Sequence, residues 1–166
     1  MLREVARKLD DWVAARNRKA QEEGLPRFSG TTIKVLGQTA LLEAGVALTL
    51  AATNDVDAYA DYPHAIDADY PHAIESEFRR LVAEVGRELD PLGHEVWMPR
   101  ETRYEEFFKG RFIRVLLAEP DAILLSKALK APAKNRPLIL EYLAAGPSER
   151  FLELTRKYRL DLEQFL

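Results

Sequence analysis

The sequence predicts an α+β fold, in which a small mixed or antiparallel sheet is flanked by helices. Three features support this fold class: an amphipathic helical pattern opens the chain, short β-branched segments follow it, and helical segments end it. The regular strand-helix alternation of a parallel α/β sheet is absent. At 166 residues the chain fits one domain, with an N-terminal helix over 1–24, a sheet-containing core over 31–118 and C-terminal helices over 121–166.

Five elements are predicted in about the first half of the chain. Apolar residues at three- and four-residue spacing indicate a helix over about the first twenty residues. The β-branched segment that starts at Thr31 indicates a strand, 38–45 a short helix, and 47–58 a second strand. Helical spacing of apolar residues returns from Ile74 to Leu89, so another helix is expected there.

The second half is predicted to add two strands and three helices. The residues His-Glu-Val-Trp-Met over 94–98 follow a turn and indicate a third strand, whereas 104–108 is interpreted as a connecting turn. The apolar segment 112–117 indicates the fourth strand. Helices are predicted over 122–131, 137–145 and 148–165.

One short segment occurs twice. Asp-Tyr-Pro-His-Ala-Ile spans 61–66 and again 69–74. Each copy has the composition of a helix start, because Pro is tolerated in the first turn, and the first copy is interpreted as an insertion. A solenoid is excluded, since it needs several longer units. His64 and His72 are interpreted as loop or helix-cap residues, with a transition-metal site that includes His94 as the alternative.

Composition excludes several classes of function. The chain contains no Cys, which excludes disulfides, thiolate metal sites and cysteine nucleophiles. Its net charge of −3 gives no general attraction to the phosphate backbone of nucleic acids, so RNA binding would need a local basic patch. The charged residues 1–19 do not resemble a signal peptide, and the apolar stretch 40–52 is too short to cross a membrane. A cytoplasmic protein without a membrane partner is therefore expected.

The sharpest candidate for chemistry is the pair of acids in the segment Thr-Asn-Asp-Val-Asp, which begins at Thr53. On a strand, Asp55 and Asp57 lie on one face with their Cα atoms about 6 to 7 Å apart, so both carboxylates can reach one divalent cation. Mg²⁺ prefers such hard oxygen ligands and commonly combines one or two carboxylates with substrate phosphates. The alternative interpretation is a solvated strand end, because Asp-x-Asp is a common sequence.

Three segments together resemble a known family. They are Val-Leu-Gly-Gln-Thr-Ala-Leu over 35–41, Thr-Asn-Asp-Val-Asp over 53–57, and a lysine-containing helical segment followed by Lys-Asn-Arg over 121–136. Together they are similar to minimal nucleotidyltransferases of the polymerase-beta superfamily. Within it, the resemblance is to the AbiEii-like and related uncharacterised branch, some of whose members act as toxins in toxin-antitoxin systems. The similarity covers about residues 31–145.

The resemblance implies a nucleotidyltransferase-like fold and a set of nucleotide-binding residues. Gly37 and Gln38 correspond to the glycine-rich turn that faces the nucleotide phosphates, and Thr53, before the two acids, is assigned to the same nucleotide site. Lys127 corresponds to the lysine of the family's later helix, which contacts the nucleotide phosphates or the active site.

The same resemblance implies a metal site. Asp55 and Asp57 would hold Mg²⁺ or Mn²⁺ and, with Lys127, would be the catalytic residues. A third metal-binding acid should come from a neighbouring strand, and Glu95 in the predicted third strand is the candidate.

The function implied is transfer of a nucleotidyl group from an NTP to an unidentified acceptor, with RNA, a protein and a small molecule all open and a toxin-antitoxin context suggested by the family branch. A second hypothesis is an inactive binding or interaction module with the same fold. It is favoured by Gln38, Ala51 and Asn135, which replace a small residue, an Arg and an Asp of the family pattern. The third is a structural domain with an accidental Asp-x-Asp.

Overall fold

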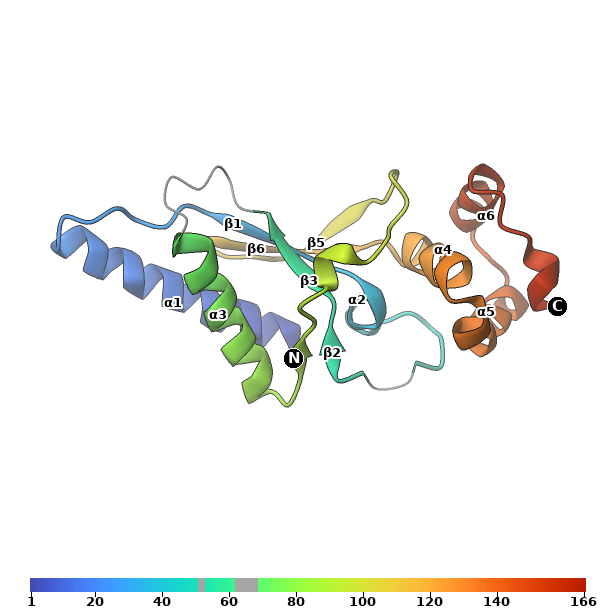
Figure 1. Ribbon diagram of the computed structural model, residues 1–166, viewed down its shortest axis with the longest axis horizontal. Helices are drawn as coiled ribbons and strands as arrows, with labels where there is room; N and C mark the ends of the chain where they lie inside the picture. The colour runs from blue at the N-terminus through green and yellow to red at the C-terminus, as the bar shows by residue number, and fades with distance from the viewer. Residues whose placement is uncertain (51–52, 62–68) are drawn as a thin grey trace.

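A computed structural model describes residues 1–50, 53–61 and 69–166 of the chain (Figure 1). It confirms the α+β class, with a four-stranded mixed sheet, a two-stranded sheet and C-terminal helices. The molecule is elongated, with α1 towards one end and the C-terminal helices at the other. The elements, in chain order, are α1 (Leu2–Glu22), β1 (Thr31–Val35), α2 (Gly37–Glu43), β2 (Asp55–Val56), β3 (Ala58–Asp61), α3 (Asp69–Glu84), β4 (Glu88–Leu89), the 3₁₀ helix η1 (Gly93–Glu95), β5 (Tyr104–Lys109), β6 (Ile113–Ala118), α4 (Pro120–Lys130), α5 (Pro132–Ala145), α6 (Glu149–Lys157) and the 3₁₀ helix η2 (Leu162–Phe165).

The main sheet has the strand order β3-β1-β6-β5. Strand β1 pairs in parallel with β6, so that Thr31 lies opposite Ile113, and antiparallel with β3, so that Lys34 lies opposite Tyr59. Strands β5 and β6 form an antiparallel pair at the other edge. The small second sheet consists of β2 and β4 in parallel. Both sheets together position the end of β1 and the start of α2 next to β2.

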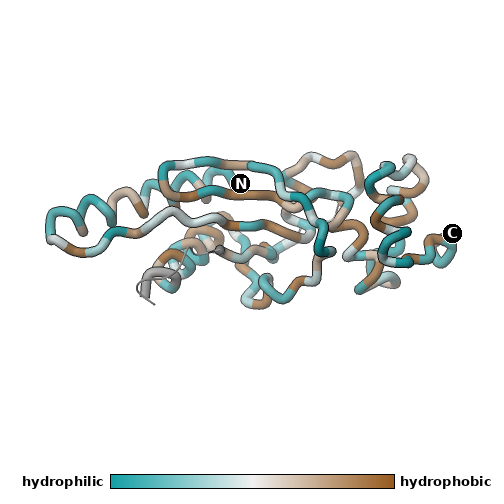
Figure 2. Tube along the Cα trace, turned by 90° about the horizontal axis from the view of Figure 1, so that it is seen from above, coloured by the Kyte–Doolittle hydropathy of each residue, from teal (hydrophilic) through white to brown (hydrophobic). Residues whose placement is uncertain are grey.

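Helices α1 and α3 cover one face of the main sheet (Figure 1). Ile33 and Val35 of β1 are buried on this face, whereas Lys34 points to the opposite face, where its ammonium group lies 4.9 Å from the ring centre of Tyr104. Figure 2 shows hydrophilic and hydrophobic residues alternating along α1, as expected for a helix with one face against a core. The amphipathic helix predicted from the first residues is therefore confirmed.

A buried carboxylate joins α1 to the sheet. Asp10 is 5% exposed, and its Oδ1 accepts hydrogen bonds from the backbone N–H groups of Phe112 (2.7 Å) and Ile113 (2.9 Å). Its Oδ2 accepts from Nε of Arg111 at 3.4 Å. Burial alone would raise the pKa of Asp10, but these hydrogen bonds outweigh it and hold the pKa below its ordinary value. The start of β6 is thus fixed to the middle of α1.

The strand predicted over 47–58 is wrong in its first part. Residues 47–50 form no strand, because the backbone N–H and the hydroxyl of Thr49 both donate to Glu141 of α5, at 2.8 and 3.1 Å. This contact holds the segment against the C-terminal helices instead of the sheet. Residues 51–52 lie outside the described part of the chain, and the strand begins at Asp55.

The strand predicted over 94–98 is also wrong. The chain forms η1 there and then runs without regular structure. The Trp97 ring packs edge-on against Tyr158 at 5.5 Å, and the Trp97 carbonyl accepts a hydrogen bond from Ser126 of α4. These apolar residues therefore pack on the C-terminal helices.

Two further elements differ from the prediction. The expected turn over 104–108 is the edge strand β5, whose apolar and polar residues do not alternate because a bulge lies between Glu106 and Phe108. Leu89 belongs to β4 and not to the preceding helix, because α3 ends at Glu84 and Gly86 (φ +74°) turns the chain.

The remaining predicted helices are confirmed with changed bounds. Helix α5 begins at Pro132, earlier than predicted, and the expected last helix divides into α6 and η2 after Arg159, which has a φ of 54°. The second copy of the duplicated segment starts α3, whereas residues 62–68, which include most of the first copy, lie outside the described part. Among the described helices, none combines the length and the apolar composition needed to span a membrane.

Candidate functional site

The two acids of the Asp-Val-Asp segment lie where β2 ends and β3 begins. Val56 between them is fully buried, whereas Asp55 is exposed and Asp57 is half-buried, so the acids share the side that faces away from the core. Backbone contacts fix both residues. The hydroxyl of Thr39 donates to the carbonyl of Asp55 at 3.1 Å, and the N–H of Leu36 donates to the carbonyl of Asp57 at 2.8 Å.

Gly37 lies directly against the Asp57 carboxylate. A Cβ atom at this position would be 2.2 Å from Asp57 Oδ2, and the backbone has a φ of +61°. Only glycine meets both conditions, since other residues rarely adopt this φ and their Cβ atoms cannot come so close. The glycine turn and the second acid, which the sequence assigned to one site, are therefore in contact.

The parallel pairing of β2 with β4 brings Asp90 beside Asp57. Val56 lies opposite Leu89, and the N–H of Asp90 donates to the carbonyl of Val56 at 3.0 Å. A side-chain hydrogen bond links the two carboxyl groups. Burial raises the pKa of Asp57, and the hydrogen bond and the charge of Asp90 raise it further, while Lys127 acts in the opposite direction. Asp57 and Asp90 therefore act on each other directly, and we call them the acid pair.

Asp90 is a candidate site residue that the sequence interpretation did not include. The signal was present, because Leu89-Asp90 repeats the pattern of Val56-Asp57, an apolar residue followed by an acid. Helical spacing assigns Leu89 to the preceding helix, so the local pattern indicates no strand end at the acid that follows it.

Lys127 faces the acid pair from α4. Burial lowers the pKa of its ammonium group, the negative charge of Asp57 opposes this effect, and Lys134 adds to the lowering. A half-buried cation within the electrostatic field of Asp57 is suited to bind a phosphate that also approaches the acids.

A pocket of about 360 Å³ opens beside these residues, between α2, α4 and α5. Gln38, Thr53 and Lys127, which the sequence assigned to nucleotide binding or catalysis, all line it. The other described lining residues are Thr49, Lys134, Asn135, Pro137 and Leu138. Two lysines and no acid among the described lining residues make this pocket a cationic one, and we call it the lysine pocket.

Glu95 lies apart from this group. Its side chain is 63% exposed in η1, and its carboxylate is 3.7 Å from Nε2 of His94. The groups that act on the Asp57 carboxylate are Asp90, Lys127 and Asp55. Because 94–98 forms no strand, no strand pairing brings Glu95 into register with the acids, and Asp90 occupies the neighbouring position for which Glu95 was predicted.

The carboxylates fit a divalent cation that binds together with a substrate. Within residues 1–50, 53–61 and 69–166, no three His, Asp or Glu side chains are arranged to hold a metal ion by themselves, which also leaves a site at His72 and His94 unsupported. Asp57 and Asp90 nevertheless offer adjacent hard oxygen ligands. Mg²⁺ is commonly bound in this way, through one or two carboxylates, with phosphate oxygens and water as the other ligands.

Asn135, which replaces an acid of the family pattern, has a structural role here. Its amide donates to the carbonyl of Ala131 at 2.9 Å and to that of Lys127 at 3.3 Å, and so caps the C-terminal end of α4. An aspartate at this position would place a negatively charged carboxylate beside these carbonyl oxygens, where the asparagine amide now donates hydrogen bonds. The amide is therefore explained by helix capping and does not by itself indicate lost activity.

Replacing Asn135 with aspartate is accordingly expected to lower the free energy of unfolding by about 1–2 kcal/mol, because the amide donor is lost and the carboxylate is repelled by the carbonyl oxygens of Lys127 and Ala131. Urea unfolding followed by circular dichroism measures this. Asn135→Ala is the matched control, since it removes the same hydrogen bonds without adding charge and should be the less destabilised variant. Equal or greater stability of Asn135→Asp would contradict the capping role.

Comparison with known proteins gives no relative for this chain: no family model, no curated protein and no solved structure matches it. The resemblance to nucleotidyltransferases therefore stays a prediction.

Proposed function

We propose that this chain is a metal-dependent nucleotidyltransferase, which transfers a nucleotidyl group from an NTP to an acceptor. One observation carries the proposal: the Asp57 carboxylate lies against Gly37, shares a hydrogen bond with Asp90 and interacts with Lys127. Two acids, a glycine turn and a lysine from four separate parts of the chain thus meet beside one cationic pocket.

Each residue has a role in this proposal. Lys127 and Lys134 bind the triphosphate in the lysine pocket, and Gln38 and Thr53 contact it from the opposite wall. Asp57 and Asp90 would hold Mg²⁺ or Mn²⁺, with the exposed carboxylate of Asp55 beside them. When bound, such a cation neutralises triphosphate charge and stabilises the charge that develops during transfer.

Calorimetric titration of the protein with ATP, GTP, CTP or UTP, in the presence and absence of Mg²⁺, tests nucleotide binding. We expect at least one NTP to bind in the presence of Mg²⁺ and to bind at least about tenfold more weakly to Asp57→Asn and to Asp90→Asn. Glu95→Gln removes an acid from the neighbouring turn and is the matched control, with an expected change of less than about twofold. A larger loss of NTP binding in Glu95→Gln than in Asp90→Asn would instead support Glu95 as the third metal-binding acid.

Incubation with NTPs labelled at the α-phosphate, with total RNA, a protein extract or small hydroxyl compounds as acceptors, tests transfer. Metal-dependent labelling that Asp57→Asn abolishes would support the enzyme and would identify an RNA, protein or small-molecule acceptor. Metal-dependent binding without labelling of any acceptor would favour the inactive module, for which Gln38 in the lysine pocket is the supporting observation. Growth arrest of cells that express the gene, but not of cells that express Asp57→Asn, would support the toxin role.

A further inference from the structure

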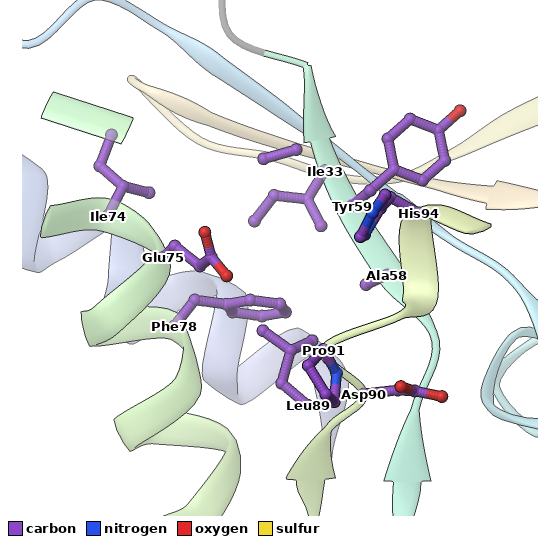
Figure 3. Close-up of a pocket in the computed structure, with 11 residues that line it drawn as sticks. Ile33, Ala58, Tyr59, Ile74, Glu75, Phe78, Leu89, Asp90, Pro91 and His94 are labelled. Carbon is purple, nitrogen blue, oxygen red and sulfur yellow. The ribbon is translucent and has the colours of Figure 1, made fainter. Parts of the chain in front are cut away.

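A second pocket includes Asp90 among its lining residues (Figure 3). It has a volume of about 180 Å³ and is formed by β3, α3 and the chain from β4 to η1. Figure 3 shows the Asp90 carboxylate directed towards the junction of β2 and β3, which carries Asp57. Asp90 is therefore shared between the acid pair and this pocket, which we call the α3 pocket.

The walls of the α3 pocket are firmly held. Ile33, Phe78 and Leu89 are nearly fully buried and form its apolar part. The turn that carries His94 packs tightly on β3, since a Cβ atom at Gly93 would be 2.8 Å from the backbone N and O atoms of Ala58. A preformed apolar pocket with a few polar groups is the usual form of a small-molecule site.

The polar groups of the α3 pocket differ from those of the lysine pocket. Glu75 and Asp90 line it, and no Lys or Arg occurs among its described lining residues. Arg79 lies behind this lining, where it donates to the carbonyl of Leu89 at 3.0 Å and pairs with Glu75 at 3.2 Å. This pairing orients the Glu75 carboxylate and offsets part of its charge. A phosphate or carboxylate entering the pocket would still meet the Glu75 carboxylate and, among the described lining residues, no Lys or Arg.

The two pockets flank the acid pair. Figure 1 shows β2 and β3 between α3 on one side and α4 and α5 on the other. Nucleotidyl transfer is an in-line displacement, so the acceptor must approach the α-phosphorus from the side opposite the leaving pyrophosphate. With the triphosphate in the lysine pocket, the α3 pocket lies on the side of the acids from which an acceptor approaches.

We propose that the α3 pocket binds the acceptor of the transfer reaction, and that the bound part of the acceptor is a single hydroxyl-bearing ring without negative charge, neutral or carrying an ammonium group. This inference rests on the proposed function. In the reaction, the acceptor hydroxyl oxygen forms a bond to the α-phosphorus of the NTP. The bond from that phosphorus to the bridging oxygen of the β-phosphate breaks, pyrophosphate leaves, and the hydroxyl proton passes to solvent water.

Two probes that share a ring and a hydroxyl but differ in charge test the inference. Tyramine carries an ammonium group and 4-hydroxyphenylacetate a carboxylate. In the presence of Mg²⁺ and the NTP that binds, amide NMR shifts of Ala58, Ala60 and Leu89 should follow tyramine with a Kd on the order of 1 mM, and 4-hydroxyphenylacetate should bind at least about tenfold more weakly. Equal or tighter binding of 4-hydroxyphenylacetate would overturn the inference.

Variants separate pocket binding from general charge effects. Glu75→Gln is expected to reduce the preference for tyramine by at least about threefold. Glu84→Gln removes one charge from the same helix, where Glu84 pairs with the neighbouring Arg80, and should leave the preference unchanged. Ala60→Phe fills the α3 pocket and should prevent tyramine binding, with thermal unfolding measured to verify that the fold persists. A preference that survives both Glu75→Gln and Ala60→Phe would place the probe elsewhere and overturn the inference.

The results also distinguish this inference from the proposed function. NTP binding with no binding of tyramine, or label transfer to RNA and to no small hydroxyl compound, would overturn the acceptor assignment and leave the nucleotidyltransferase in place. Absence of Mg²⁺-dependent NTP binding would overturn the proposed function and the inference with it.

Discussion

Replacing Gly37 with alanine is expected to weaken Mg²⁺-dependent NTP binding at least about 100-fold and to lower the free energy of unfolding by about 2–4 kcal/mol. The added Cβ would be 2.2 Å from Asp57 Oδ2, so either the carboxylate or the turn must move, and the φ of +61° is unfavourable for alanine. Calorimetry measures the binding, and urea unfolding measures the stability.

Gly45 offers a matched control at the other end of α2. Its φ of +68° imposes the same backbone strain, and the described residues place no atom within 4 Å of an added Cβ. Gly45→Ala should therefore lose only about 1–2 kcal/mol of stability and keep NTP binding. If both alanine variants bind NTP as the natural protein does, the contact of Gly37 with Asp57 has no role in the site.

Replacing Asp10 with alanine is expected to lower the free energy of unfolding by about 3 kcal/mol at pH 7. The substitution leaves the buried N–H groups of Phe112 and Ile113 without the acceptor that now lies at 2.7 and 2.9 Å. Asp11→Ala is the control, because Asp11 is exposed and also pairs with Arg111, at 3.0 Å, and its loss should change stability by less than about 1 kcal/mol. Urea unfolding of both variants measures the difference.

The contribution of Asp10 should also depend on pH. Its pKa is held below the ordinary value of 3.8, so folding favours the ionised form. The stabilisation is then complete above the pKa of the unfolded chain and is lost as the pH falls through the lower pKa of the folded protein. The stability difference between the natural protein and Asp10→Ala should thus be constant from about pH 7 to 5 and shrink below about pH 4. A difference that does not change down to pH 2 would contradict this account.

Elements with strong periodicity were predictable from the sequence. The helix from Leu2, the strand from Thr31 and the strand that starts near Ile113 each bury one regular face, and the local pattern reports this burial. The missed elements depend on distant contacts. Thr49 is held by a side chain of α5, and the residues around Trp97 pack on α4 and Tyr158, which no local pattern records.

The residues of the candidate site were also only partly predictable from the sequence. Asp55 and Asp57 are two residues apart, and strand geometry alone puts them on one side. Asp90 joins them only through the pairing of β4 with β2, two strands of two residues each, and such short strands have no periodicity to recognise. The position of Gly37 against Asp57 similarly depends on the tertiary fold, although the glycine itself was identified from the sequence.

The strand order has a consequence for how the protein assembles during synthesis. β1, which leads directly into Gly37, has β6 as its parallel neighbour, and β6 comes late in the chain. A nascent chain that ends before β6 leaves one edge of β1 open, and Lys127 follows later still. Pairings between distant segments form slowly, and open strand edges associate with other chains. Asp55 and Asp57 are thus synthesised well before β6 and Lys127, the segments that complete the site around them.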